Sequence, residues 1–179
     1  GRDHFQRTDA RCRLLKAEAH AVLWLLRWNA NMQTTLTAAA AAHGIDASRL
    51  VFAPLLPADQ HLSRLAAADV FLDAWPCNAH TTASDALWAG LPLLTCTGDT
   101  FAGRVAASLL YNVGLPELVT SSQADYERLA IELATQPDRL TALRQKLATN
   151  RLTTPLFDTV RFTRHLEQGM GRLAAAYAG

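Results

Sequence analysis

The sequence predicts an α/β domain in which a parallel β-sheet is covered by helices on both faces. Short apolar runs alternate with helical patterns over most of the chain, and this alternation is typical of right-handed β-α-β crossovers. Glycines stand where three helical patterns stop, at Gly44, Gly90 and Gly114, as expected for residues just beyond helix C-termini. The chain has 179 residues, half of them hydrophobic, which is enough for one such domain and its core.

Five apolar runs are predicted to be strands. The first run, AVLWLLRW, has no polar residue until its arginine and therefore reads as a buried strand. The others are short and are bounded by proline, aspartate or glycine. The predicted strands cover residues 21–28, 50–54, 70–73, 93–96 and 118–120.

Eight helices are predicted between and after these strands. Pro57 stands in the first turn of one helix, and Ser122-x-x-Asp125 resembles a capping box at the start of another. The long final helix carries one apolar stripe, whose partner surface the sequence leaves open: Phe162, Leu166, Met170, Leu173 and Tyr177. The predicted helices cover residues 11–19, 32–43, 57–68, 81–89, 104–113, the segments that follow 122 and surround 140–147, and 158–178.

Charge and composition exclude several classes of partner. The net charge is +1, and no basic stripe is interleaved with aromatic residues, which argues against nucleic acid. No apolar run is long enough to span a membrane and no signal-peptide pattern is present, so no membrane partner is predicted. Cys12, Cys77 and Cys96 are odd in number and widely spaced. They predict free thiols and a cytoplasmic location, where disulfides are rare.

An anion-binding site is predicted where His80, Thr81 and Thr82 begin a helix behind a strand. The first turn of a helix has unpaired N–H groups and a partial positive charge, which favour phosphate. In parallel sheets, ligands bind outside the carboxyl ends of the strands, where this segment lies. The alternative is structural, with threonine as an ordinary N-cap and histidine as a loop residue. Spacing alone leaves both interpretations open.

Three further side chains could contribute to a nucleotide site. Asp85 shares a helical face with Thr81 and Thr82, and its carboxylate could accept hydrogen bonds from a ribose diol. His61 and Arg64 lie one turn apart on the preceding helix and could stack on a base or bind its oxygens. The alternative for each is a solvated helix surface.

Metal, cofactor and nucleophile motifs give little support to other chemistries. Cys77-x-x-His80 has ligand-like spacing, but no second pair follows at zinc-finger distance. The spacing of His61, His80 and Asp85 matches no metal motif. Neither G-x-G-x-x-G, a Walker A loop nor G-x-S-x-G occurs. We therefore predict no metal and no cofactor.

Together these segments resemble the O-linked N-acetylglucosamine (O-GlcNAc) transferases, which modify serine and threonine of proteins. The segment AADVFLDAWPCNAHTTASDALWAGLP, residues 67–92, carries most of the resemblance. It is joined in order by AVLWLLRW, RLVFAPLLPADQHLSR and GDTFAGRVAASLL, so that the resemblance spans about residues 21–157. A set of separated motifs in the same order is more specific than any one of them.

The resemblance implies a fold and a division of the chain. Members of this family have two Rossmann-like lobes in the GT-B arrangement, with the donor between them, and this chain resembles the C-terminal lobe. Residues 1–157 would form that nucleotide-sugar-binding lobe and residues 158–179 a C-terminal helix. The N-terminal lobe and the tetratricopeptide repeats of the family have no counterpart in this sequence.

The resemblance also implies roles for individual residues. His80, Thr81 and Thr82 match the motif that holds the UDP diphosphate, and the two threonines would stabilise the leaving group. The other implied UDP contacts are Asp85 to the ribose, His61 beside the uridine, and Arg64 with the backbone around Leu56 to the uracil. A family lysine is replaced by Ala58, which removes one polar contact to the nucleotide.

The implied reaction transfers N-acetylglucosamine from UDP-GlcNAc to a protein hydroxyl, with inversion and without a metal. The protein acceptor would bind through the missing regions, so this chain alone is expected to be inactive. Three alternatives remain: a relative that uses another nucleotide sugar such as GDP-fucose, a nucleotide-binding module without catalysis, and an interaction domain that kept only the fold.

Overall fold

The computed structural model describes the backbone of residues 2–178 and the side chains of residues 10–177. Every strand pairing in it is parallel. The strands are β1 (Leu23–Leu26), β2 (Leu50–Ala53), β3 (Phe71–Leu72), β4 (Leu93–Cys96) and β5 (Val119–Thr120).

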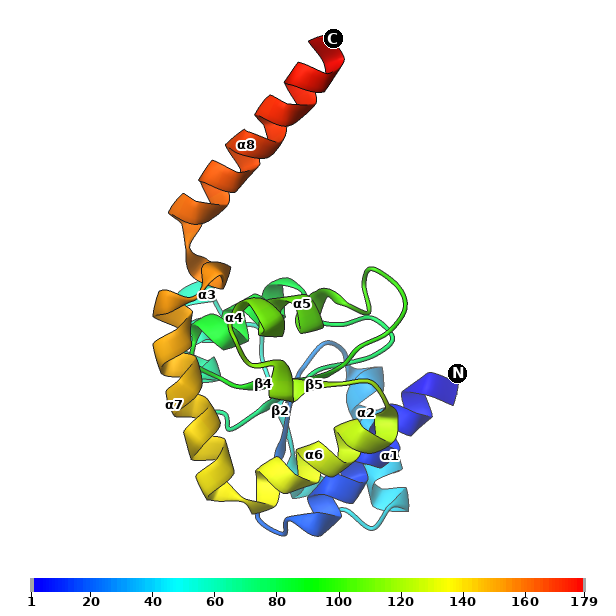
Figure 1. The fold of residues 1–179 in the computed structure, drawn as a ribbon. Coiled ribbons are helices and arrows are strands. Elements are labelled where there is room, and N and C mark those ends of the chain that lie inside the picture. The colour runs from blue at the N-terminus through cyan, green and yellow to red at the C-terminus, as the bar shows by residue number, and fades with distance from the viewer. Residues whose placement is uncertain (1, 179) are drawn as a thin grey trace.

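Helices connect the strands and continue beyond the last of them (Figure 1). The α-helices are α1 (Arg2–Ala17), α2 (Ala30–Ala42), α3 (Ala58–Leu65), α4 (Thr81–Trp88), α5 (Val105–Asn112), α6 (Gln123–Thr135), α7 (Pro137–Thr153) and α8 (Thr159–Ala178). Three short 3₁₀ helices are η1 (Ala47–Arg49), η2 (Pro116–Leu118) and η3 (Pro155–Phe157).

Helices cover both faces of the strands, as the sequence predicted. Figure 1 shows α3, α4 and α5 on one side of the strands and α1, α2 and α6 on the other. Strand β4 is central, since it contacts α4 and α5 on one side and α6 on the other. All four of its residues are buried, as expected for a parallel strand between two helical layers.

The strands form two hydrogen-bonded groups where the sequence predicted one sheet. One group is β1–β2 and the other is β3–β4–β5, and within residues 2–178 no ladder joins them. Strand β3 has only two residues, Phe71 and Leu72, and both pair with β4. The parallel arrangement is therefore confirmed, but the sheet is interrupted between the β1–β2 pair and the β3–β4–β5 group.

Strand β1 differs from the buried eight-residue strand that was predicted. It has four residues that alternate between half-buried and exposed, with Trp24 40% and Leu26 39% exposed. Leu23 and Leu25 point to the core, and the guanidinium of Arg64 lies over the Trp24 ring, 5.6 Å from its centre. The prediction was wrong because an apolar run does not reveal that only one face of a strand is covered.

The core on each side of β4 is built mainly from leucine. Leu87 of α4 and Leu110 of α5 are fully buried on one side of β4, and Leu133 of α6 is 1% exposed on the other. Gly90, with φ of +84°, lets the chain turn from α4 into β4, as predicted from its position after the helix. The burial of these side chains fixes the position of α4 relative to the strands.

Helix α8 projects away from the rest of the chain (Figure 1). Its predicted apolar stripe is exposed, with values between 50% at Leu166 and 95% at Tyr177. No helix within residues 2–178 combines the length and apolar character needed to cross a membrane. The division of the chain at residues 157 and 158 stays a prediction.

Candidate functional site

The predicted anion-binding site lies at the start of α4. His80 is the N-cap residue and makes no side-chain cap hydrogen bond, while Thr81 and Thr82 are exposed. The first backbone bond to the cap runs from Ser84 N to His80 O at 3.1 Å, so the N–H groups before it have no acceptor in the preceding turn. Ala83 is fully buried. The helix therefore packs on one face and presents its first turn to solvent.

A buried aspartate holds the loop that leads to this helix. The Oδ1 atom of Asp73 accepts hydrogen bonds from the backbone N–H groups of Ala74 and Ala79, both at 2.7 Å. Its Oδ2 atom accepts one from the Thr95 hydroxyl at 2.6 Å. Burial raises the pKa of Asp73 above its ordinary value, and these hydrogen bonds and Arg11 offset only part of the rise.

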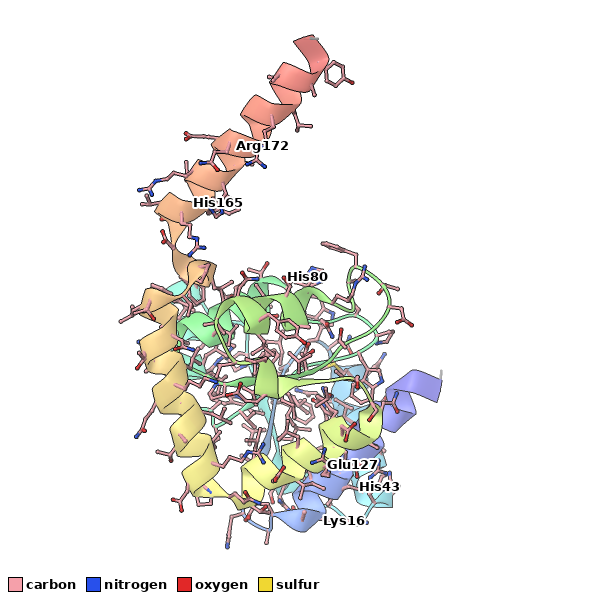
Figure 2. The ribbon with its side chains drawn as sticks, in the orientation of Figure 1. Lys16, His43, His80, Glu127, His165 and Arg172 are labelled. Carbon is pink, nitrogen blue, oxygen red and sulfur yellow. The ribbon has the colours of Figure 1, made fainter. Side chains whose placement is uncertain are left out.

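A second loop, residues 97–104, packs against the first. The backbone N–H of Asn78 donates to Ala102 O at 2.9 Å, and the Asn78 side chain donates to Ala74 O at 2.9 Å. An added Cβ on Gly103 would lie 2.8 Å from Pro76 O, so the two loops are in close contact. Phe101, 77% exposed, places its ring edge-on to that of His80 at 6.1 Å. Figure 2 labels His80 on the side of the strands where α4 and α5 lie.

His61 and Arg64 are brought together on α3, which contacts α4. Arg64 Nη2 lies 3.1 Å from His61 Nδ1, and Arg64 Nη1 donates to Pro54 O at 2.6 Å. The guanidinium is thus already engaged with the segment that follows β2. Leu56, also in that segment, is half-buried.

Asp85 and Ala58 complete the residues singled out from the sequence. Asp85 is half-buried one turn into α4, on the face shared with Thr81 and Thr82. Ala58 is exposed at the first position of α3. The structure therefore places every predicted UDP contact on α3, on α4 or immediately before them.

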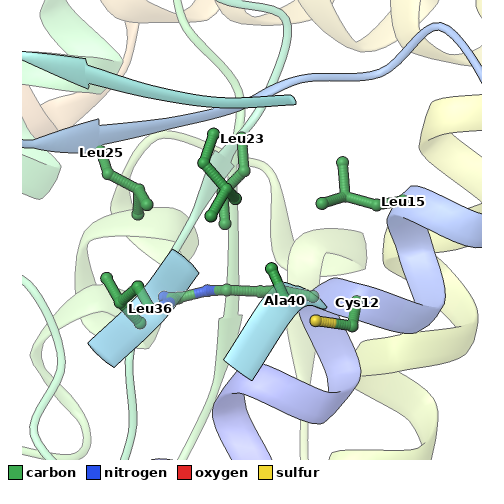
Figure 3. A pocket seen from close by; sticks show the side chains of 8 residues that line it. Cys12, Leu15, Leu23, Leu25, Leu36 and Ala40 are labelled. Atoms are coloured by element: carbon green, nitrogen blue, oxygen red, sulfur yellow. The ribbon is translucent and has the colours of Figure 1, made fainter. Parts of the chain in front are cut away.

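A small apolar cavity lies elsewhere, between α1, α2 and β1 (Figure 3). None of the predicted site residues lines it. Within the described part of the chain, no three histidine, cysteine, aspartate or glutamate residues are grouped to hold a metal ion. Six of the residues around the cavity are labelled in Figure 3: Cys12, Leu15, Leu23, Leu25, Leu36 and Ala40.

Sequence reasoning missed Asp73 and Asn78, which shape the loop before His80. A signal was present, because Asp73 is a polar residue at the end of the predicted strand over residues 70–73 and Asn78 follows in the segment after it. Burial of the two side chains, 1% and 5% exposed, is the feature that could not be read from the order of residues.

The fold and this site define a Rossmann-like α/β protein, a class in which ligands bind beyond the carboxyl ends of parallel strands. The sequence profile of Glycosyl transferase family 41 matches residues 6–166. The chain therefore belongs to glycosyltransferase family 41.

Two relatives and one solved structure show how far the similarity extends. The chain is 39% identical over 158 residues to the probable UDP-N-acetylglucosamine–peptide N-acetylglucosaminyltransferase SEC of Arabidopsis thaliana, covering 88% of this chain and 16% of that protein. It is 34% identical over 169 residues to the UDP-N-acetylglucosamine–peptide N-acetylglucosaminyltransferase of Caenorhabditis elegans, covering 94% of this chain and 15% of that protein. A Thermobaculum terrenum O-GlcNAc transferase mutant, K341M, superposes with a TM-score of 0.85 at 31% identity, covering 92% of this chain and 32% of that one.

These comparisons confirm the resemblance to the O-GlcNAc transferase family and the α/β fold class. The chain spans about a sixth of the length of the two sequence relatives. It also spans about a third of the chain of the solved structure.

Cys12, Cys77 and Cys96 form no disulfide among the described residues, in agreement with the predicted thiols. The cellular compartment stays a prediction.

Proposed function

We propose that this chain is the donor-binding half of a glycosyltransferase that moves N-acetylglucosamine from UDP-GlcNAc to protein serine or threonine. One observation carries the proposal. In a family 41 chain, the exposed start of α4 offers free N–H groups and the hydroxyls of Thr81 and Thr82. The names of the relatives support the choice of donor and of a peptide acceptor. The acceptor would bind to parts of the enzyme outside this chain.

The proposed binding mode follows the two helices. The diphosphate lies against His80, Thr81 and Thr82, where the helix dipole favours negative charge. Asp85, one turn further along α4, accepts hydrogen bonds from the ribose hydroxyls. A carboxylate in the first turn itself would repel phosphate, so its place one turn inside the helix suits the sugar better.

The uracil end of the nucleotide would lie against α3 and the segment before it. His61 stacks beside the uridine, and Arg64 and the backbone at Leu56 contact the base. Arg64 already donates to Pro54 O and lies beside His61 Nδ1. In this proposal its guanidinium fixes both the imidazole and the backbone that the base meets.

The proposed reaction inverts the sugar carbon and uses no metal. The acceptor oxygen forms a bond to C1 while the bond from C1 to the β-phosphate oxygen breaks, and the electron pair of that bond stays on the departing UDP. The N–H groups of α4 and the hydroxyls of Thr81 and Thr82 stabilise the negative charge that develops there. The proton of the acceptor hydroxyl passes to a group outside this chain.

Isothermal titration calorimetry of this chain with UDP tests the binding half of the proposal. We expect wild-type binding, and a weaker affinity in the Thr81→Ala and Thr82→Ala variants. The matched control is Thr35→Ala, an exposed helical threonine on α2, which should bind like wild type. Unchanged affinity in both site variants would contradict the proposal.

Competition experiments separate the remaining candidates. Displacement by UDP but not by GDP supports a UDP-sugar donor, whereas preference for GDP supports a donor such as GDP-fucose. Absence of binding to both nucleotides at millimolar concentration supports an interaction domain without a nucleotide site.

A further inference from the structure

We infer that Asp73 is a positioning residue, which sets the start of α4 by fixing the loop between β3 and His80. The inference rests on the proposed function, because it concerns the same UDP site. It assigns a role to a residue whose hydrogen-bond partners include none of the proposed nucleotide-binding residues.

The Asp73 side chain closes the loop on itself. Ala74 and Ala79 stand at the two ends of the loop, and both backbone N–H groups donate to Oδ1 at 2.7 Å. One oxygen atom thus holds the first and last turns of the segment together. Asn78 reinforces the closure, since its Nδ2 donates to Ala74 O at 2.9 Å and to Cys96 O at 3.3 Å.

Asp73 is itself held in place from two sides. On the strand side, Oδ2 accepts from the Thr95 hydroxyl in β4 at 2.6 Å, and Thr95 is fully buried. On the helix side, the Tyr126 hydroxyl of α6 donates to the Asp73 backbone carbonyl at 2.9 Å, and the Tyr126 ring meets Trp75 edge-on at 5.3 Å. These contacts fix the loop to β4 and α6.

The contact at Ala79 transmits this position to the proposed site. Ala79 directly precedes His80, whose carbonyl accepts the first hydrogen bond from Ser84. His80 has no side-chain cap bond of its own. Beside the ring contact of His80 with Phe101, the hydrogen bond from Ala79 N–H to Asp73 is the side-chain constraint next to the start of α4. The exposed Thr81 and Thr82 follow at once. A displacement of Ala79 would therefore move the N–H groups and hydroxyls that are proposed to bind the diphosphate.

Two substitutions separate the hydrogen-bonding role of Asp73 from its charge. Asp73→Asn keeps an oxygen that can accept from the two N–H groups. Its new NH₂ group lies beside the Thr95 hydroxyl oxygen, and that oxygen can accept a hydrogen bond from it. Asp73→Ala removes both side-chain oxygens and leaves only the backbone carbonyl as an acceptor. Calorimetry with UDP should show about a tenfold or greater loss of affinity in Asp73→Ala, since small misplacements of binding groups have large effects. Asp73→Asn should stay within about threefold of wild type, because its oxygen can accept the same N–H groups.

The matched control is Asn150→Ala in α7. Asn150 likewise makes a side-chain-to-backbone hydrogen bond, although as the donor, to Val113 O at 2.9 Å, and it lies outside the proposed site. Asn150→Ala should lower thermal stability and leave UDP affinity unchanged. Wild-type affinity in folded Asp73→Ala would overturn the positioning role, and so would an equal loss of affinity in Asn150→Ala.

A measurement on the wild-type chain covers the case in which Asp73→Ala does not fold. Amide hydrogen exchange followed by NMR should show Ala79 protected to the level of the amides in β4, and rapid exchange at Ala79 would overturn the inference. Failure of the wild-type chain to bind UDP would overturn the proposed function itself. In that event, the NMR chemical shifts of the Thr81 and Thr82 amides test the positioning role of Asp73. The role requires these shifts to differ from wild type in Asp73→Ala and to match wild type in Asp73→Asn.

Discussion

Arg151 donates from Nη1 to the backbone carbonyl of Trp88 at 2.5 Å, which ties the end of α7 to the last turn of α4. A cationic side chain at a helix C-terminus also meets the negative end of the helix dipole. The Trp88 ring packs edge-on against Phe157 of η3, with ring centres 5.1 Å apart. The helix that begins at the proposed diphosphate site is thus fixed at its far end by the C-terminal part of the lobe.

Arg151→Ala should destabilise the chain by about 0.5–1.5 kcal/mol, because the Trp88 carbonyl loses its charged donor at an exposed contact that water can reach. Urea denaturation followed by circular dichroism measures this change. Arg161→Ala on the exposed surface of α8 is the control and should shift the midpoint little. Equal stability of the Arg151 variant and wild type would show that the contact does not contribute.

Gly103→Ala should destabilise by about 1–3 kcal/mol, the usual range for overpacking. An added Cβ would lie 2.8 Å from Pro76 O and 3.2 Å from Thr100 Oγ1, and a backbone oxygen cannot move aside without moving its loop. Gly98→Ala is the matched control, since its Cβ would meet nothing closer than 3.7 Å. Thermal melts of the two variants should therefore differ, and coincident melts would contradict this account.

Under the proposed function, Thr81→Ala and Thr82→Ala should each lower turnover when this chain serves as the donor-binding half of a complete glycosyltransferase. Removal of one donor to a developing oxyanion typically costs about 10²-fold in rate. Both side chains are exposed, so thermal stability should stay close to wild type. Turnover is measured at saturating donor with a peptide acceptor, and unchanged rates in both variants would exclude the two hydroxyls from leaving-group stabilisation.

Asp125→Asn should change how stability depends on pH. The Arg128 guanidinium and the Ser122 hydroxyl lower the pKa of Asp125 below its ordinary value of 3.8. A carboxyl whose pKa is lower in the folded chain stabilises the fold above the unfolded pKa, and this contribution is lost as pH falls through the folded pKa. The stability difference between wild type and Asp125→Asn should therefore be largest near neutral pH and shrink below about pH 4.

Urea midpoints across the acid range measure this difference. Arg128→Ala supplies the control, because it removes the main cause of the lowered pKa and should weaken the pH dependence. A constant difference between wild type and Asp125→Asn at all pH values would contradict the prediction.

The order of helices and parallel strands could be predicted because local signals mark most boundaries. Gly44, Gly90 and Gly114 all adopt positive φ where the sequence placed helix ends. Ser122 caps α6 by accepting from Asp125 N at 3.1 Å, as the capping-box pattern predicted. Helix α4 begins at Thr81, as predicted, and ends one residue earlier, at Trp88.

Tertiary contacts account for what the sequence did not reveal. The number of strand residues that pair depends on the partner, so the predicted strand over residues 70–73 shortens to Phe71–Leu72. Helix α1 extends from Arg2, well before the predicted start at residue 11. The loop from Asp73 to His80 contains no regular element, and its shape depends on hydrogen bonds to β4, α6 and the 97–104 loop.

The exposure of Thr81 and Thr82 has a consequence for how this protein can change over time. Their side chains carry none of the core packing, whereas Ala83 and Leu87 on the opposite side of the same helix are fully buried. Under the proposed function, replacements at the outer positions can therefore alter ligand preference while the buried residues keep the fold. New specificities can arise on one side of this helix while the other side preserves the architecture.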